Sequence, residues 1–310
     1  MVRILDGIDA FLDRLGSVEL MPLFLAILCH FAKMACTSRA WRNVLAAAYP
    51  DAKVPWRSVF GAYLAGVGIN AIIPARAGDA ARIYLAHRAV PGSTYTTVVS
   101  STVVLTLFDF TAATLLFAWA LTLGELPGLD VLPRLDSFDF AFLLDRPLAF
   151  VLVLAAILIG LGGLGVWIHG HVRNFWGRVA QAFAVLRPPT RYVRQVAPWQ
   201  AGDWLLRLAT IWFLLDAYDI PQTLHNAALV QVTQSTATLL PITPGGLGTE
   251  QAFLLYILNG AAPASVLLAF SVGARLTITA VNVVAGFTAI GLMMRTFRYS
   301  SLRPADDTPG

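Results

Sequence analysis

Charged residues are scarce in this chain. Asp, Glu, Lys and Arg make up 13% of its 310 residues, whereas hydrophobic residues make up 57% and the mean hydropathy is +0.68. Soluble domains carry roughly 25% charged residues, so this composition excludes an ordinary water-soluble protein. Several windows reach the about 20 apolar residues that cross a bilayer core. The sequence therefore predicts an all-α, polytopic helical membrane protein.

The surplus of positive charge is also small. A net charge of +4 is too low to indicate nucleic acid as a partner, and the basic residues cluster beside apolar segments. Anionic lipid headgroups are the natural partners of Lys and Arg in such places. Cysteine is rare as well: Cys29 and Cys36 share one face of an apolar run and cannot bridge each other. We expect both to be small buried residues.

Motifs of covalent or metal-dependent chemistry are missing. The sequence contains no His-Glu-x-x-His zinc motif, no Gly-x-Ser-x-Gly motif and no Walker-type phosphate loop. Residues 1–17 mix acidic and basic side chains, which is not the pattern of a secretory signal. We therefore expect no metal, no cofactor and no enzymatic activity.

Long apolar runs predict five full membrane spans. They cover residues 18–38, 95–123, 147–168, 200–218 and 264–294. A segment over 171–198 has apolar residues on one side and several Arg around it, which is typical of a helix lying in the headgroup plane. Residues 296–310 form a polar tail.

Two shorter apolar segments are interrupted by helix-breaking residues. Two aliphatic residues, Pro, three residues and Gly follow one another at 72–78 and again at 239–245. Pro removes a backbone donor and Gly frees the backbone, so each copy should break a helix. At membrane depth such a break is tolerated only where protein or a watery cavity covers it. We predict two broken-helix hairpins, over 56–90 and 223–261, and small residues in the first should let helices approach closely.

The distribution of Lys and Arg orients these segments. The segments 39–57 and 171–198 and the tail after 294 are basic, whereas 124–146 and the turn at 216–222 are acidic. Because Lys and Arg concentrate on the cytoplasmic side, both hairpins should be re-entrant, the first from the inside and the second from the outside. The halves 18–123 and 200–294 would then form an inverted repeat, joined by 147–168 and 171–198, in a single integral membrane domain over 1–310. Many secondary transporters with a midplane site have this architecture.

The residues at the two breaks resemble a known family. The patterns are Asn70-x-x-x-Pro74-x-Arg76-x-Gly78-Asp79-x-x-Arg82 and Pro241-x-Thr243-Pro244-Gly245-Gly246-x-Gly248, with Glu250 close behind. They are similar to the membrane domain of lysylphosphatidylglycerol synthase/flippase proteins. In bifunctional members a soluble aminoacyl-transferase domain follows, and we expect none after the short tail here. The resemblance implies lipid translocation in the cytoplasmic membrane of a bacterium or archaeon, and we leave a homodimer open.

We interpret the two breaks as the two sides of one central site that binds a lipid headgroup. Arg side chains can grip a phosphate bidentately, and helix-end amides attract anions. The alternatives are an ordinary basic helix at the membrane edge for the first break and a hinge without ligand for the second. The candidate headgroup-binding residues are Asn70, Arg76, Asp79, Arg82, Thr243, Gly245, Gly246, Gly248 and Glu250.

Three charged residues, Asp109, Arg207 and Arg275, lie within predicted spans. Each unpaired charge there costs at least about 2.5–3.5 kcal/mol, so they should face the interior and be paired. Superposing the hairpins places Arg275 one residue from Asp109, which predicts an intramembrane charge pair. The pair could clamp the halves together or act directly in transport. His30 and Lys33 carry a weaker signal, since Lys33 could snorkel to the surface.

The sequence predicts translocation of a lipid or lipid-linked headgroup by alternating access between two inverted halves. The expected partner is a phospholipid or glycolipid with an anionic headgroup. Alternatives are a membrane-embedded lipid-modifying transferase, a docking subunit for one, or a small-solute transporter.

Overall fold

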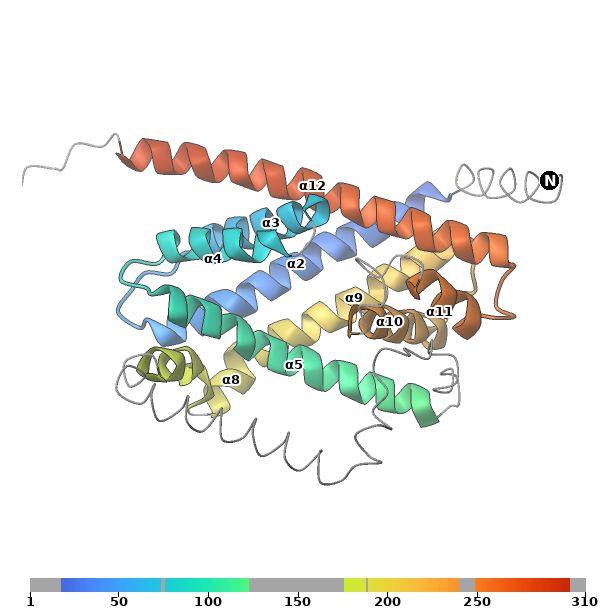
Figure 1. The fold of residues 1–310 in the computed structure, drawn as a ribbon, viewed down its shortest axis with the longest axis horizontal. Helices are drawn as coiled ribbons and strands as arrows, with labels where there is room; N and C mark the ends of the chain where they lie inside the picture. The colour runs from blue at the N-terminus through green and yellow to red at the C-terminus, as the bar shows by residue number, and fades with distance from the viewer. Residues whose placement is uncertain (1–17, 74–75, 123–175, 188, 240–248, 302–310) are drawn as a thin grey trace, which may run out of the picture.

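A computed structural model describes residues 18–73, 76–122, 176–187, 189–239 and 249–301. This part of the chain is helical, apart from an isolated bridge between Asn259 and Ala262 and short connections (Figure 1). Its elements are α2 (Leu20–Ala48), α3 (Trp56–Ile72), α4 (Ala77–Ala89), α5 (Tyr95–Thr122), η2 (Phe183–Leu186), α8 (Pro189–Gln195), α9 (Ala197–Ala217), α10 (Leu224–Leu239), α11 (Thr249–Ile257) and α12 (Ala264–Ser301). A further helical stretch covers 176–182.

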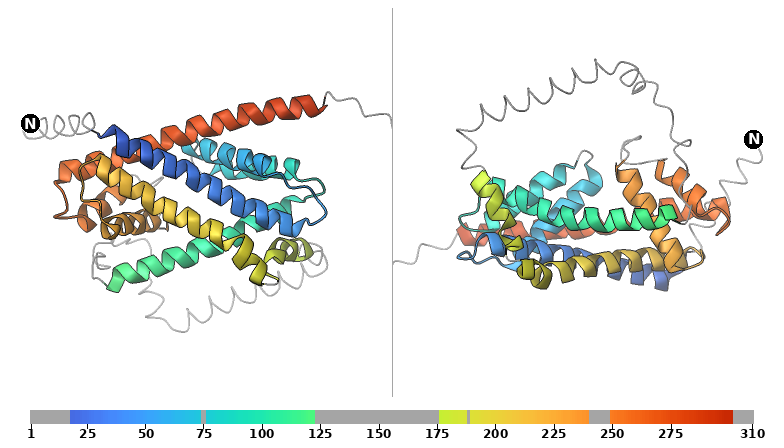
Figure 2. Two further views of the ribbon diagram at one scale, coloured as in Figure 1. Left: turned by 180° about the vertical axis from the view of Figure 1, so that it is seen from behind. Right: turned by 90° about the horizontal axis from the view of Figure 1, so that it is seen from below.

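Four long helices, α2, α5, α9 and α12, run lengthwise through the molecule (Figures 1 and 2). The shorter pairs α3–α4 and α10–α11 lie toward its two opposite ends. Helix α2 packs along α9, and α3 packs between α4 and α12. The helix breaks predicted within 56–90 and 223–261 are confirmed, because α3 ends at Ile72 before α4 begins at Ala77, and α10 and α11 are separate helices.

Three described helices are long and apolar enough to cross a membrane: Leu20–Ala48, Tyr95–Ala120 and Ala264–Met294. They overlap the predicted spans at 18–38, 95–123 and 264–294. Helix α9 occupies the predicted span at 200–218, but Asp and Arg residues lower its hydropathy and it does not belong to this group. The predicted span at 147–168 lies outside the described residues.

The first helix is longer than predicted. Residues 39–48 were expected to start a basic loop, yet α2 continues to Ala48. The chain has no Gly or Pro between 23 and 49, and the extra turns bury Trp41, Val44 and Leu45 almost completely. The helix stops two residues before Pro50, which disfavours helical conformation in the residue ahead of it.

The predicted single helix over 171–198 is wrong. Its described part consists of the stretch 176–182, then η2 and then α8, and Ala197 already belongs to α9. The sequence places Pro188 and Pro189 together, and Pro is tolerated in the first turn of a helix but not in its interior. At the other end, α12 reaches Ser301, so the polar tail predicted at 296–310 begins as helix.

Small residues let α3 contact its neighbours backbone to backbone. A Cβ atom added to Gly78 of α4 would collide with the carbonyl oxygen of Gly66, and one added to Gly68 would lie 2.7 Å from the Cα of Gly286 on α12. Such close approach is how helices associate in membranes. The prediction of close packing in the first hairpin is therefore confirmed.

Each hairpin packs into an apolar cluster of its own. One cluster joins α9, α10, α11 and the start of α12, and the other joins α3, α4 and the end of α2. Along α2, Ala26 belongs to the first cluster and Trp41 to the second. Lys33 and Thr37 lie between these two positions, which is where the polar side chains of the interior gather.

Candidate functional site

The break between α3 and α4 is held together by Asn70. Its Oδ1 accepts a hydrogen bond from the Gly78 amide at 2.7 Å, and its Nδ2 donates to Asp79 Oδ1 at 3.0 Å. One side chain at the end of α3 thus satisfies an amide in the first turn of α4, which would otherwise lack a partner. Because Gly78 also packs on Gly66, the turn is fixed on both sides.

The two arginines of this hairpin lie differently. Arg82 Nε lies 3.4 Å from Asp79 Oδ1, but this buried nitrogen has no well-aligned hydrogen bond among the described residues. The Arg82 guanidinium carbon lies 5.9 Å from the centroid of the Trp41 ring. The Arg76 side chain is 81% exposed and reaches Asp79 only at 4.0 Å. Arg76 also adopts a left-handed conformation with φ 58°, which is uncommon for a residue other than glycine. It therefore remains available to a ligand.

Glu250 ties the second hairpin to α12. It lies in the first turn of α11, and Arg275 Nη1 donates to its Oε2 at 3.3 Å. The Gln234 side chain of α10 reaches the same carboxylate. Glu250 therefore connects both helices of the hairpin to the long helix beside it.

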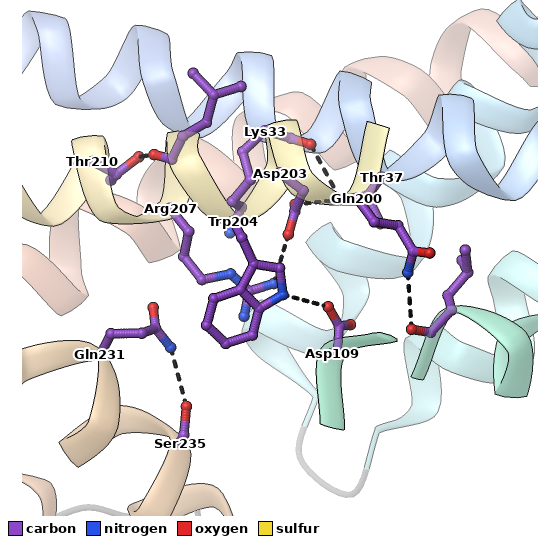
Figure 3. A network of polar contacts seen from close by, with 12 residues as sticks. Lys33, Thr37, Asp109, Gln200, Asp203, Trp204, Arg207, Thr210, Gln231 and Ser235 are labelled. Carbon is purple, nitrogen blue, oxygen red and sulfur yellow. Dashed lines mark hydrogen bonds and ion pairs between the residues drawn. The ribbon is translucent and has the colours of Figure 1, made fainter. Parts of the chain in front are cut away.

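A polar network in the middle of the bundle centres on Asp203 of α9 (Figure 3). Its side chain is 5% exposed. Thr37 of α2 donates to Oδ1 at 2.6 Å, and Arg207 donates to Oδ2 at 2.9 Å. Charge-assisted bonds of this kind are stronger than neutral ones. They allow a carboxylate to remain in the apolar interior.

The network continues from α9 to α5. Trp204 Nε1 donates to Asp109 Oδ1 at 2.9 Å, and the Arg207 guanidinium lies 4.9 Å from the Trp204 ring centroid (Figure 3). Gln200 donates to the Leu105 carbonyl at 2.9 Å. A separate hydrogen bond joins α2 to α12, between His30 Nε2 and Asn282 Oδ1 at 2.8 Å. Polar bonds thus link the long helices to one another at this level.

Two cations of the network keep unused hydrogen-bonding capacity. The Nε of Arg207 is buried and has no hydrogen-bond partner among the described residues. Lys33 lies in the field of Arg207, Asp203 and Asp109, yet its ammonium makes no hydrogen bond or ion pair within the described part of the chain. Buried donors without partners are costly, so an anion at this place would be stabilised.

A family model described as lysylphosphatidylglycerol synthase TM region matches residues 3–286. The chain belongs to this family. The match confirms the resemblance read from the residues around the two helix breaks. Comparison with curated proteins and with solved structures finds no match.

Membership of the lysylphosphatidylglycerol synthase TM region family places this protein in a membrane and gives it a lipid-related function. A phospholipid is the molecule that the family's description names. Charged side chains within membrane spans are costly unless they have a partner or a function, so the polar network is a candidate functional site.

The structure brings some of the predicted site residues together. Asn70, Asp79 and Arg82 form one cluster, Arg76 points outward at its edge, and Glu250 joins another cluster with Arg275. The candidates Thr243, Gly245, Gly246 and Gly248 lie outside the described residues.

The predicted pairing of Asp109 with Arg275 is corrected by the structure. Asp109 bonds to Trp204 and lies in the field of Arg207, whereas Arg275 pairs with Glu250. The prediction relied on superposing two hairpins by short motifs. It could not account for partners on the neighbouring helices, which are closer.

Asp203 is not among the charges predicted within spans, because this residue lies only three positions after the predicted start of a span at 200. A signal was nevertheless present: Asp203 and Arg207 are four residues apart, the spacing of an ion pair on one helix face. Nothing in the sequence shows that Thr37 and Trp204 would complete the network, since the partners come from three helices.

Proposed function

We propose that this protein moves an anionic phospholipid across the cytoplasmic membrane of a bacterial or archaeal cell. The headgroup would pass through the polar network while the acyl chains stay in the bilayer. The observation that carries the proposal is the pair of cations, Lys33 and Arg207, whose donors are not used up by the described residues around them.

The charges of the network favour an anion that comes and goes. Lys33 and Arg207 balance Asp109 and Asp203, so the network without ligand is formally neutral. Both carboxylates are already engaged by donors, Asp203 by Thr37 and Asp109 by Trp204. The remaining capacity is therefore cationic, which suits a phosphate in transit more than acid–base chemistry.

The first hairpin would supply the headgroup from one side. Arg76 is exposed at the hairpin turn just before α4, and Arg82 follows within α4. Two guanidinium groups near a helix break can grip a phosphate bidentately. We propose that they capture the headgroup before it reaches Lys33.

The arrangement of the hairpins supports alternating access. The pairs α3–α4 and α10–α11 lie toward opposite ends of the bundle (Figures 1 and 2). We propose that both are re-entrant and belong to two inverted halves, which rock to expose the network to each side in turn. The acidic segments of the sequence would face outward and the basic segments the cytoplasm.

Translocation by the purified protein tests this proposal. Vesicles that contain the protein and a fluorescent phosphatidylglycerol are exposed to a membrane-impermeant quencher, and the quenched fraction is followed over time. Lys33→Gln should slow translocation about ten- to a hundredfold, because a charge-assisted bond contributes about 1.5–3 kcal/mol. The protein should still fold, since Lys33 has no bonded partner in the described structure to lose.

Two comparisons make the result specific. Arg191→Gln, a matched loss of one cation on α8, should translocate like the wild type because it lies outside the network. Lys33→Arg should keep most of the activity. Unchanged translocation by folded Lys33→Gln, or equal rates for anionic and zwitterionic lipid, would contradict the proposal.

A further inference from the structure

An apolar groove lies on the bundle apart from the polar network. It is formed by α2, the start of α3 and the second half of α12, and its volume is about 1060 Å³. Among the described residues that line it, the polar ones are Arg57, Ser58 and Thr288. Its floor is closed by Gly61 and Leu64, which are buried. The volume matches the upper range of ligand pockets, about 300–1000 Å³.

The dimensions of the groove fit an acyl chain. Its lining on α12 runs from Ala280 to Met293, which is about 20 Å at 1.5 Å per residue. One leaflet of a bilayer has about 15 Å of hydrocarbon, half of the about 30 Å core. Dividing the volume of the groove by its length of about 20 Å gives a mean cross-section of about 50 Å². This is about half the cross-section of a helix 10–12 Å in diameter. An acyl chain therefore fits within the groove, whereas a transmembrane helix of another protein would enter it only in part.

One end of the groove is basic and carries aromatic residues. Arg57 lines it there, Lys53 lies four residues before, and neither side chain makes an ion pair or hydrogen bond within the described part of the chain. Beside them, the Arg39 guanidinium lies between Trp56 and Trp199, at 5.9 and 5.8 Å from their ring centroids. Trp residues are enriched at the membrane–water interface. This end is thus at the depth of the lipid headgroups.

We infer that the groove binds one acyl chain of an anionic phospholipid whose phosphate is held by Arg57. The occupant has charge at one end and hydrocarbon along the rest, as the groove requires. The charged end and the apolar part of the groove also follow one another as they do in a phospholipid. Their order comes from the register of α3 on α12, because Gly61 lies against Met293 and Gly68 against Gly286. Arg57 therefore stands beyond the Met293 end of the lining, and Ala280 lies deeper. The site is separate from the polar network and does not depend on translocation.

Photo-crosslinking tests the inference. The full-length protein is reconstituted with a phosphatidylglycerol probe that carries a diazirine near the end of one chain, and crosslinked peptides are identified by mass spectrometry. We expect crosslinks within residues 280–293. Val284→Trp, which fills the groove from an exposed position, should reduce them about tenfold. Arg57→Gln should reduce them about tenfold as well, and Arg57→Lys should restore them.

Matched controls separate this site from general lipid contact. Phe287→Trp changes an exposed residue of α12 that does not line the groove, and should crosslink like the wild type. Lys33→Gln should crosslink normally even if translocation fails, so the two proposals fail separately. Equal crosslinking in Val284→Trp, or equal crosslinking of a phosphatidylcholine probe, would overturn the inference. So would a Val284→Cys variant that forms a disulfide between two copies of the chain while the lipid probe gives no crosslink.

Discussion

Replacement of Asp203 by Asn should destabilise the protein strongly although the shape of the side chain is preserved. Asn can still accept the Thr37 hydrogen bond, but its amide cannot neutralise Arg207. Removing one partner of a buried ion pair costs about 3–5 kcal/mol, because the other charge stays behind unpaired. The Arg207 side chain is 30% exposed to solvent. It is also attracted by a second carboxylate, that of Asp109. We therefore expect a loss at or just below the lower limit of that range, about 2–3 kcal/mol.

Thermal stability in detergent measures this effect. The protein is heated in steps, and the fraction that elutes as a single species from a size-exclusion column is recorded. A loss of 2–3 kcal/mol should lower the midpoint by roughly 5 °C or more. The double variant Asp203→Asn with Arg207→Gln should recover part of the loss, because it removes the unpaired charge as well.

The control for this prediction is Asp216→Asn. Asp216 is also on α9 and partly buried, but it forms no ion pair within the described structure. Its replacement should change the midpoint little. If Asp203→Asn were no more destabilising than Asp216→Asn, the central place of Asp203 in the network would be refuted.

Further predictions concern the hairpins and the orientation. Gly78→Ala should lower the midpoint by several degrees, because its Cβ has no room beside the Gly66 carbonyl. In a double-mutant cycle, Glu250→Gln and Arg275→Gln should show a coupling energy of about 1 kcal/mol, since the pair is partly exposed. In a cysteine-free background, Gln222→Cys should react with an impermeant reagent from outside intact cells, as expected from the acidic turn around it.

Each of these has its own control or contradicting result. Gly177→Ala places a Cβ in open space on a helical residue, so it should leave the midpoint unchanged. Strictly additive losses in the double-mutant cycle would show that Glu250 and Arg275 are not coupled. Arg191→Cys should be labelled only after permeabilisation, and labelling of both cysteines from the same side would refute the orientation.

The class of protein and the limits of most helices could be predicted from the sequence. Low charge and long apolar runs depend on composition alone, because the bilayer imposes the same requirement on every residue that faces it. The helix break around Pro74 is a property of the local backbone and was correctly placed. The expected loop at 39–48 was wrong because the burial of Trp41 and Leu45 against other helices favours a longer α2.

Only the tertiary structure decided which charges meet. Asp203, Arg207 and Asp109 are all visible in the sequence, but Thr37 and Trp204 become their partners through the packing of α2, α5 and α9. The same holds for the apolar groove, whose walls come from segments more than 200 residues apart in the chain. Local pattern reports the environment that each residue prefers, whereas hydrogen bonds of 3 Å depend on how whole helices are placed, and that placement results from contacts distant in sequence.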